Sequence, residues 1–189
     1  MPAMLKVLDG ARHLPFASVS EDAAANSIVF MAPSKTFNIA GIVSSYCIIE
    51  DEAIRDRFFK YIAACEIDFP SIFSTVATEA AYKEGTQWRS EMLAYVRGNI
   101  DLVDRWLREH IPAVRAVRPH ASFLIWLDCR KLGLSHDALI DLFVNKARLA
   151  LNDGAMFGAQ GSGFMRLNVG CPRSILEEAL ESLEKAINN

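Results

Sequence analysis

Lys35 is the side chain of this sequence whose type and setting are best suited to chemistry. It comes after the apolar run Ile28-Val29-Phe30-Met31 and before the small-residue turn Asn38-Ile39-Ala40-Gly41. The apolar run predicts a buried strand, and desolvation at the end of such a strand favours the neutral, nucleophilic form of an amine. A single lysine is more commonly a solvated surface charge, so the residue type alone leaves both interpretations open.

Arg166 is the second candidate, because it is the one charged residue in the apolar stretch Phe164-Met165-Arg166-Leu167-Asn168-Val169. A charge in a buried strand needs a partner. The planar guanidinium can make two parallel hydrogen bonds to a carboxylate, which lysine cannot reproduce. The residue alone leaves open whether that carboxylate belongs to a substrate or to an acid of this chain.

Two segments far apart in the sequence carry a family resemblance. They are Ala32-Pro33-Ser34-Lys35-Thr36-Phe37-Asn38-Ile39-Ala40-Gly41, and Asn152-Asp153-Gly154-Ala155-Met156-Phe157-Gly158 with Gly161-Ser162-Gly163-Phe164-Met165-Arg166-Leu167-Asn168-Val169-Gly170-Cys171-Pro172-Arg173. Shorter matches lie at His13-Leu14-Pro15-Phe16-Ala17-Ser18 and Ala80-Ala81-Tyr82-Lys83-Glu84-Gly85. Together they resemble the C-terminal portion of fold-type I pyridoxal-phosphate enzymes. The resemblance is to the class I/II aminotransferase-like branch that acts as cystathionine β-lyases (carbon–sulfur lyases).

The resemblance implies a cofactor, pyridoxal 5′-phosphate, and roles for three residues. Lys35 is expected to form a Schiff base with the cofactor and then to move the α-proton of an amino-acid substrate. Arg166 is expected to bind the substrate α-carboxylate. Ser34 could hydrogen-bond the cofactor phosphate, and a turn or capping role is the alternative. Both β-elimination at a carbon–sulfur bond and transamination begin with the same proton transfer, so these residues do not distinguish a lyase from an aminotransferase. Members of the family are homodimers, so a homodimer is expected.

The sequence departs from the family pattern near the lysine. Many aminotransferases carry a phosphate-binding arginine shortly after it, where this chain has Ile42-Val43-Ser44, and a serine three residues before it, where this chain has Ala32. The lyase-like branch often lacks that arginine as well, which favours that branch. The family's N-terminal cofactor-binding elements have no counterpart here. The alternative function is therefore a catalytically incomplete folding or oligomerisation module derived from the family.

The composition argues against several other functions. The net charge of −3 gives no electrostatic reason to expect nucleic acid or an anionic membrane as a partner. No apolar run approaches the roughly 20 residues that span a bilayer, and a cytoplasmic location is the default expectation. The four cysteines are isolated from one another and from the histidines, which argues against a zinc site. Cys47 and Cys129 lie in apolar runs and are predicted to be small buried residues.

The periodicity predicts the elements that position these residues. Helices are expected over 21–26, 50–64, 70–82, 86–110, 136–146 and 172–187, and strands over 28–31, 41–49, 114–117, 122–127 and 165–169. Gly154, Gly158, Gly161 and Gly163 do not match a dinucleotide or P-loop spacing and are better interpreted as turn residues.

The predicted fold class is α/β and α+β. Residues 1–85 would form the end of the large transferase domain, with a partial sheet that carries the lysine. Residues 86–189 would form a linking helix and a complete small α+β C-terminal domain.

Overall fold

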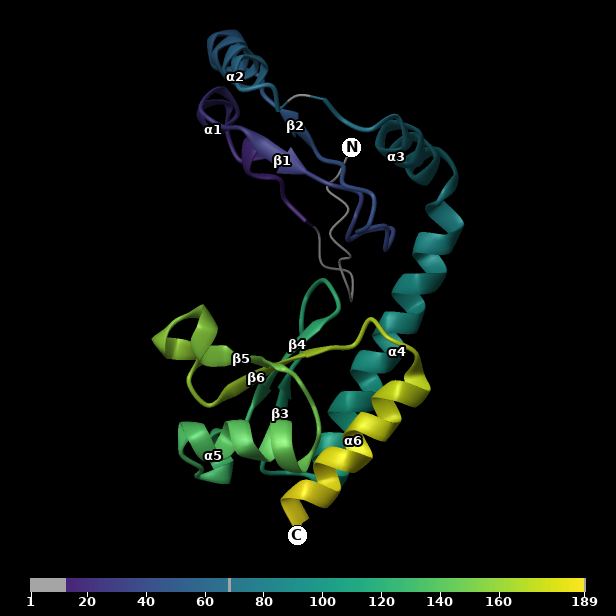
Figure 1. The fold of residues 1–189 in the computed structure, drawn as a ribbon, viewed down its shortest axis with the longest axis vertical. Coiled ribbons are helices and arrows are strands. Elements are labelled where there is room, and N and C mark those ends of the chain that lie inside the picture. The colour runs from purple at the N-terminus through teal and green to yellow at the C-terminus, as the bar shows by residue number, and fades with distance from the viewer. Residues whose placement is uncertain (1–12, 68, 189) are drawn as a thin grey trace. The chain divides into compact units, whose positions relative to one another are not determined.

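The computed structural model describes residues 13–67 and 69–188 of the 189-residue chain. Contacts within the chain divide it into two compact units, the first ending at Glu91 and the second beginning at Met92. The helices and strands of each unit are labelled in Figure 1.

The first unit contains a small sheet and three helices. Its elements in chain order are a 3₁₀ turn at Phe16–Ser18, α1 (Glu21–Ala25), β1 (Val29–Met31), β2 (Tyr46–Ile48), α2 (Glu52–Ala64), α3 (Ile72–Glu84) and the start of α4 (Thr86–His110). The two strands pair antiparallel, with Val29 opposite Ile48, and form a two-stranded sheet. The sequence predicted an incomplete sheet here, and the described residues of this unit add no third strand to it.

The predicted burial of the first strand is wrong for this chain. Phe30 at the centre of β1 is 63% exposed, and the residues on either side of it are only half-buried. A strand is buried on both faces only when other layers cover it, and two short strands cannot supply those layers. The second predicted strand is also shorter than expected, because residues 41–45 form a turn and irregular backbone before β2.

Helix starts in the first unit follow the capping residues of the sequence. The side chain of Ser20 accepts a hydrogen bond from the Ala23 N–H ahead of α1, and the carboxylate of Asp51 accepts one from the Ile54 N–H ahead of α2. Such caps satisfy backbone donors that the first turn of a helix leaves unpaired. Helix α2 therefore begins close to the predicted position.

The second unit is built on an antiparallel sheet. Its strands are β3 (Arg115–Val117), β4 (Leu124–Asp128), β5 (Asn152–Asp153) and β6 (Phe164–Asn168), in the spatial order β3-β4-β6-β5. Helices α4, α5 (His136–Asp141) and α6 (Arg173–Asn188) accompany the sheet. Figure 1 shows α6 running beside the C-terminal part of α4, where His110 lies 3.2 Å from Glu184.

The core of the second unit comes from alternate residues of the strands and one face of each helix. Ile125 on β4 and Met165 on β6 are fully buried, as are Val103 on α4 and Phe143 after α5. This alternation places Trp126 and Arg166, the intervening residues, on the opposite face of the sheet. The same alternation therefore fixes the direction in which Arg166 points.

Two details of the second unit differ from the sequence prediction. The predicted helix 136–146 is α-helical only to Asp141 and continues as a π-helix over Leu142–Lys146. Strand β5 was not predicted. None of the described helices has the length and apolar character that a membrane crossing requires.

Candidate functional site

Lys35 lies on a tight turn that follows β1 in the first unit. Two backbone hydrogen bonds fix this turn: Phe37 N–H donates to Pro33 O, and Ile39 N–H donates to Ser34 O, each at 2.9 Å. Both bonds span the lysine, so its Cα is held in an ordered piece of backbone. Ser34 precedes it on the same turn and is half-buried.

Phe37 anchors the turn to the helices that follow. Its side chain is only 8% exposed, and its ring packs edge-to-face against Tyr82 of α3 with ring centres 5.5 Å apart. The Trp88 ring of α4 lies 6.5 Å from Phe37 on a tilted plane. A Cβ placed on Gly85 would lie 2.7 Å from the Phe37 ring, so the glycine makes room for it.

Two hydroxyl pairs brace the segment that follows the turn. The hydroxyls of Tyr46 and Tyr82 lie 3.1 Å apart, and those of Ser44 and Thr78 lie 2.8 Å apart. Burial raises the pKa of Tyr82 well above its ordinary value, and the hydrogen bond with Tyr46 adds to the shift. Tyr82 therefore stays protonated at neutral pH and serves as an anchor for the lysine turn.

The side chain of Lys35 is exposed, and the predicted desolvation of its amine by this chain is wrong. The reason is the incomplete sheet, which leaves the end of β1 uncovered. Within residues 13–67 and 69–188, Lys35 makes no hydrogen bond or ion pair. The lysines that form ion pairs there are Lys83, Lys146 and Lys185. An unpaired primary amine on an ordered turn is the group that condenses with an aldehyde, so this position fits pyridoxal phosphate.

Arg166 lies at the centre of β6 in the second unit, flanked across the sheet by Trp126 of β4 and Asn152 of β5. Its NH2 group donates to Asn152 Oδ1 at 2.8 Å. The guanidinium carbon lies 4.5 Å from the centre of the Phe157 ring. Its Nε is buried and has no hydrogen-bond partner among the described residues.

The sequence left open whether Arg166 pairs with the carboxylate of a substrate or with an acid of this chain. In the part of the chain that the structure describes, no acid pairs with Arg166, and its contacts are a neutral amide and an aromatic ring. The internal ion pair that the sequence left open is therefore not found among these residues.

The glycines ahead of β6 are turn residues, as predicted. A Cβ on Gly154 would lie 2.2 Å from Gly161 O, and a Cβ on Gly161 would lie 2.0 Å from Gly154 O, so the backbone crosses itself at this point. Gly158 and Gly163 have φ values of 120° and 78°, in the range that favours glycine. This crossing brings Phe157 back over the sheet toward Arg166.

Asn152 and Phe157 were not predicted as site residues, although both lie in the segment that carries the resemblance. The signal that could have identified Asn152 is a register argument. A strand beside β6 places one side chain directly opposite Arg166. That argument needs β5 to be recognised, and two residues are too short for a periodicity to reveal.

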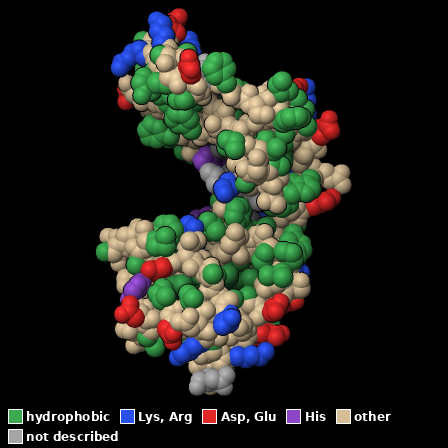
Figure 2. Space-filling model, viewed as in Figure 1, with side chains coloured by type: hydrophobic (Ala, Val, Ile, Leu, Met, Phe, Trp, Pro, Cys, Tyr) green, Lys and Arg blue, Asp and Glu red, His purple; other side chains and the backbone are tan. Residues whose placement is uncertain are grey.

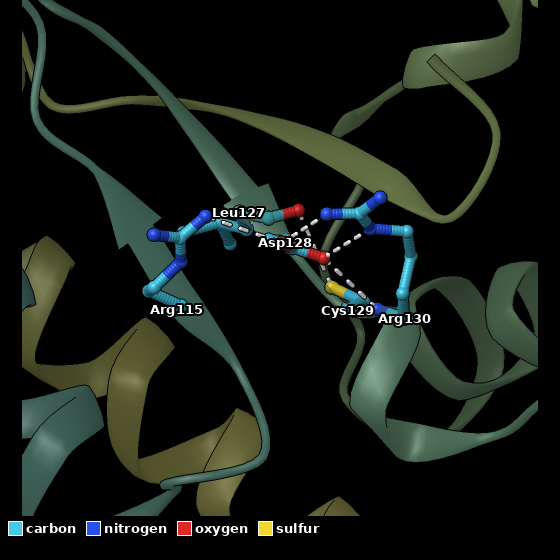
Figure 3. Close-up of polar contacts among 5 residues, drawn as sticks. All are labelled: Arg115, Leu127, Asp128, Cys129 and Arg130. Carbon is cyan, nitrogen blue, oxygen red and sulfur yellow. Dashed lines mark hydrogen bonds and ion pairs between the residues drawn. The ribbon is translucent and has the colours of Figure 1, made fainter. Parts of the chain in front are cut away.

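A separate cluster in the second unit surrounds Asp128 at the end of β4. Figure 3 shows Arg115 and Arg130 reaching this carboxylate from opposite sides. Arg130 Nε and NH2 donate to the two carboxylate oxygens at 2.8 Å each, and Arg115 NH2 lies 3.5 Å away. The Arg130 hydrogen bonds lower the pKa of Asp128 to about 2 against the opposing effect of burial. This cluster is internally paired.

Cys129, the cysteine next to Asp128 in the sequence, does not have a reactive thiol. Burial raises the pKa of Cys129 to about 12, with a smaller contribution from the charge of Asp128, so the thiol is protonated. Cys129 is 2% exposed, as predicted, whereas Cys47 is only half-buried. No group of three or more His, Cys, Asp and Glu side chains within residues 13–67 and 69–188 is arranged to hold a metal ion.

Comparison with known proteins gives the family context of these residues. No protein-family model matches the chain. The chain is 38% identical over 182 residues to cystathionine β-lyase PatB of Bacillus subtilis (strain 168), covering 96% of this chain and 47% of PatB. It is 31% identical over 176 residues to protein MalY of Escherichia coli (strain K12), covering 93% of this chain and 44% of MalY. The chain thus spans about half the length of the curated relatives it matches.

Solved structures agree with these relatives. A pyridoxal-phosphate-bound protein of the aminotransferase type from Clostridium difficile 630 is 40% identical with a TM-score of 0.94, over 98% of this chain and 48% of that one. Cystalysin from Treponema denticola, which contains pyridoxal 5′-phosphate, is 34% identical with a TM-score of 0.92, over 96% of this chain and 46% of cystalysin.

The chain therefore matches, in sequence and fold, the C-terminal part of fold-type I pyridoxal-phosphate-dependent proteins, and its predicted fold class is confirmed. Within this class its relatives include the cystathionine β-lyases, as the sequence resemblance indicated.

Proposed function

We propose that this chain is the C-terminal portion of a pyridoxal-phosphate-dependent carbon–sulfur β-lyase or aminotransferase that acts on amino acids. The observation that carries the proposal is the match along 98% of this chain to a pyridoxal-phosphate-bound structure, at a TM-score of 0.94. The unpaired Lys35 amine and the Arg166 guanidinium, which lacks an acidic partner among the described residues, give this chain side chains suited to the two chemical roles.

Lys35 is the nucleophile and the proton carrier of this proposal. Its amine would hold the cofactor and, when free, would accept and return the proton of the substrate α-carbon. Bound pyridoxal phosphate supplies the electron sink that makes this proton acidic. The anchoring of the turn by Phe37 supports the role, because an amine that moves a proton needs a fixed base for its flexible stem.

Ser34 is proposed to donate its hydroxyl to the cofactor phosphate. Its carbonyl is already used by the turn, where it accepts from Ile39 N–H at 2.9 Å. No hydrogen bond of the Ser34 hydroxyl occurs within the described residues, which leaves that group available as a donor.

Arg166 is proposed to bind the substrate α-carboxylate. Charge-assisted hydrogen bonds from a guanidinium to a carboxylate are short and directional, and they select amino acids over amines without an acid group. Asn152 accepts a hydrogen bond from one NH2 group of Arg166, and the Phe157 ring covers one side of the guanidinium plane. The other guanidinium nitrogens make no hydrogen bond among the described residues, and since Nε is buried, the ligand would bind at the terminal nitrogens.

The domain organisation, partners and location remain proposals. Residues 1–85 would belong to the large cofactor domain, and residues 86–189 would form the linking helix and the small domain. The whole protein is proposed to be a cytoplasmic homodimer that takes an amino acid as its substrate.

Borohydride reduction tests the Lys35 assignment. The chain is incubated with pyridoxal phosphate, reduced, digested and analysed by mass spectrometry. The expected result is one pyridoxyl-phosphate adduct on the peptide that carries Lys35, lost in Lys35→Ala and retained in Lys60→Ala, which removes an exposed lysine of α2. Equal labelling of many lysines, or an adduct that survives Lys35→Ala, would reject the assignment.

The alternative function, a folding or oligomerisation module, has one observation in its favour. The first unit exposes large apolar side chains, including Phe69 at 81%, Ile72 at 80% and Phe73 at 79%. Figure 2 shows hydrophobic side chains over the surface of this unit. Exposed apolar patches of this kind promote association. Sedimentation analysis that finds stable association, together with the absence of a specific Lys35 adduct, would favour the module over the enzyme.

A further inference from the structure

The surroundings of Arg166 have a feature that the carboxylate-binding role alone does not require. Arg166 is held from two directions, by Asn152 on the neighbouring strand and by Phe157 on the loop that follows it. Both contacts come from the same short segment, which the Gly154–Gly161 backbone crossing folds back over the sheet. The guanidinium therefore has a defined orientation before any ligand arrives.

Both of these contacts are electrically neutral. An amide oxygen accepts a hydrogen bond from the guanidinium without cancelling its charge, and an aromatic face attracts a cation without forming an ion pair. The buried Nε remains without a partner among the described residues. The result is an oriented but uncompensated positive charge.

Arg130 in the same unit provides an internal contrast. It also lies over a phenylalanine ring, with its guanidinium carbon 4.8 Å from the centre of Phe164. Its hydrogen-bonding partner, however, is the carboxylate of Asp128, which takes both its Nε and its NH2 at 2.8 Å. At Arg130 the carboxylate neutralises the guanidinium charge, whereas at Arg166 the amide accepts a hydrogen bond and leaves the charge unpaired.

We propose that Asn152 and Phe157 are positioning residues that orient the Arg166 guanidinium while leaving its charge free for the carboxylate of an amino-acid ligand. This inference rests on the proposed role of Arg166. It adds that position 152 must carry a neutral acceptor, because an acid there would occupy the guanidinium in place of the ligand.

Two substitutions at position 152 separate orientation from charge. Asn152→Ala removes the acceptor, so the guanidinium should become mobile and carboxylate affinity should fall by about fivefold, the effect of losing one hydrogen bond of typical strength. Asn152→Asp keeps an acceptor, so the guanidinium should stay ordered, yet carboxylate binding should fall by more than about tenfold because the charge is now paired. A purely structural role would not separate these two effects.

Nuclear magnetic resonance of ¹⁵N-arginine-labelled full chain provides both measurements. The Nε–H signal of Arg166 reports side-chain order through its heteronuclear NOE, without any ligand, and the Nε–H signals of Arg130 and Arg173 are internal references. Acetate is the carboxylate probe, titrated against chloride at the same ionic strength. Asn145→Ala is the matched control, since Asn145 also uses its side chain in a surface hydrogen bond, to Asp141 at 2.8 Å.

The expected result is saturable acetate binding at Arg166 in the wild type and in Asn145→Ala. Asn152→Ala should lose Arg166 order and bind acetate more weakly, whereas Asn152→Asp should keep that order and bind acetate most weakly. Unchanged Arg166 order in Asn152→Ala would overturn the positioning role. Equal acetate affinity in Asn152→Asp and the wild type would overturn the need for a neutral acceptor. If Arg166 of the wild type is ordered but its signal does not change with acetate, the proposed carboxylate-binding function is rejected. This outcome differs from those that reject only the positioning role of Asn152.

Discussion

Both carboxylate oxygens of Asp128 accept a hydrogen bond from the guanidinium of Arg130, at 2.8 Å each. Asp128 is 9% exposed and also lies 3.5 Å from Arg115. These contacts favour the charged carboxylate and lower its pKa from 3.8 to about 2. A carboxylate that is easier to ionise in the folded state than in the unfolded state makes stability depend on pH.

The stabilisation from Asp128 is expected to be present above its unfolded pKa of 3.8 and to disappear as the pH falls through about 2. Since both arginines are largely exposed, solvent screening reduces its size to about 1 to 2 kcal/mol. Urea unfolding of wild type and Asp128→Asn, repeated from about pH 6 downward, measures it. The difference between the two proteins should shrink across the interval from 3.8 to about 2. Asp104→Asn, which breaks an exposed pair with Arg108, is the control and should cost less than about 0.5 kcal/mol.

Asn99 is expected to be one of the most sensitive positions of the second unit. It is fully buried on α4, and its amide donates to Val169 O at 2.9 Å and Cys171 O at 3.1 Å, while its oxygen accepts from Arg173 Nε at 3.1 Å. Asn99→Ala leaves two carbonyls and a guanidinium without this partner, and should lower the free energy of unfolding by about 2 to 3 kcal/mol. Denaturant unfolding checks this, and an effect no larger than that of exposed Asn145→Ala would contradict it.

Gly85 and Gly41 form a matched pair for testing how the lysine turn is held. Gly85→Ala places a methyl group 2.5 Å from Ala81 O and 2.7 Å from the Phe37 ring, whereas a Cβ at Gly41 meets nothing within 4 Å. Gly85→Ala should therefore displace Phe37 and lower stability by about 1 to 3 kcal/mol. It should also lower the yield of the borohydride-trapped Lys35 adduct. Gly41→Ala should preserve both; equal behaviour of the two variants would show that the turn does not depend on Phe37.

Gly154 and Gly98 provide a second contrast, between a rigid and a flexible obstacle. A Cβ at Gly154 would lie 2.2 Å from Gly161 O and 2.6 Å from Phe164 O, both backbone atoms, so Gly154→Ala should destabilise the second unit by more than about 2 kcal/mol. A Cβ at Gly98 would meet only the end of the Arg173 side chain at 2.6 Å. That end can move, and alanine is the better helix former by about 1 kcal/mol, so Gly98→Ala should be near neutral. Thermal unfolding of both variants is the measurement, and a neutral Gly154→Ala would contradict the crossing.

The long helices were predictable because their signals are local and repeated. Helix α4 has the predicted bounds, Thr86–His110, since its apolar residues recur at helical spacing and Pro112 follows it. Its apolar positions do not all reach the core, however. Tyr95 is 45% exposed and lies under the guanidinium of Arg173 instead. Periodicity therefore located the helix but did not assign a contact to every residue on its face.

The parts that could not be predicted depend on contacts distant in the sequence. Strand β5 exists because Asn152 and Asp153 pair with β6, and two residues carry no periodicity of their own. The exposure of Lys35 follows from the few layers around β1, which the apolar character of residues 28–31 could not reveal. Arg166 was identified from its type and setting, whereas its neutral partners required the register of the sheet.

The close approach of Gly154 and Gly161 has a consequence for engineering. With no space for a side chain at either glycine, variation in this loop is confined to the residues between them. Met156 is 71% exposed and directly precedes Phe157, the aromatic neighbour of Arg166. A mutant library that retains both glycines and randomises Ala155, Met156 and Gln160 would therefore change the surface beside Arg166 while keeping the backbone contact that holds the loop.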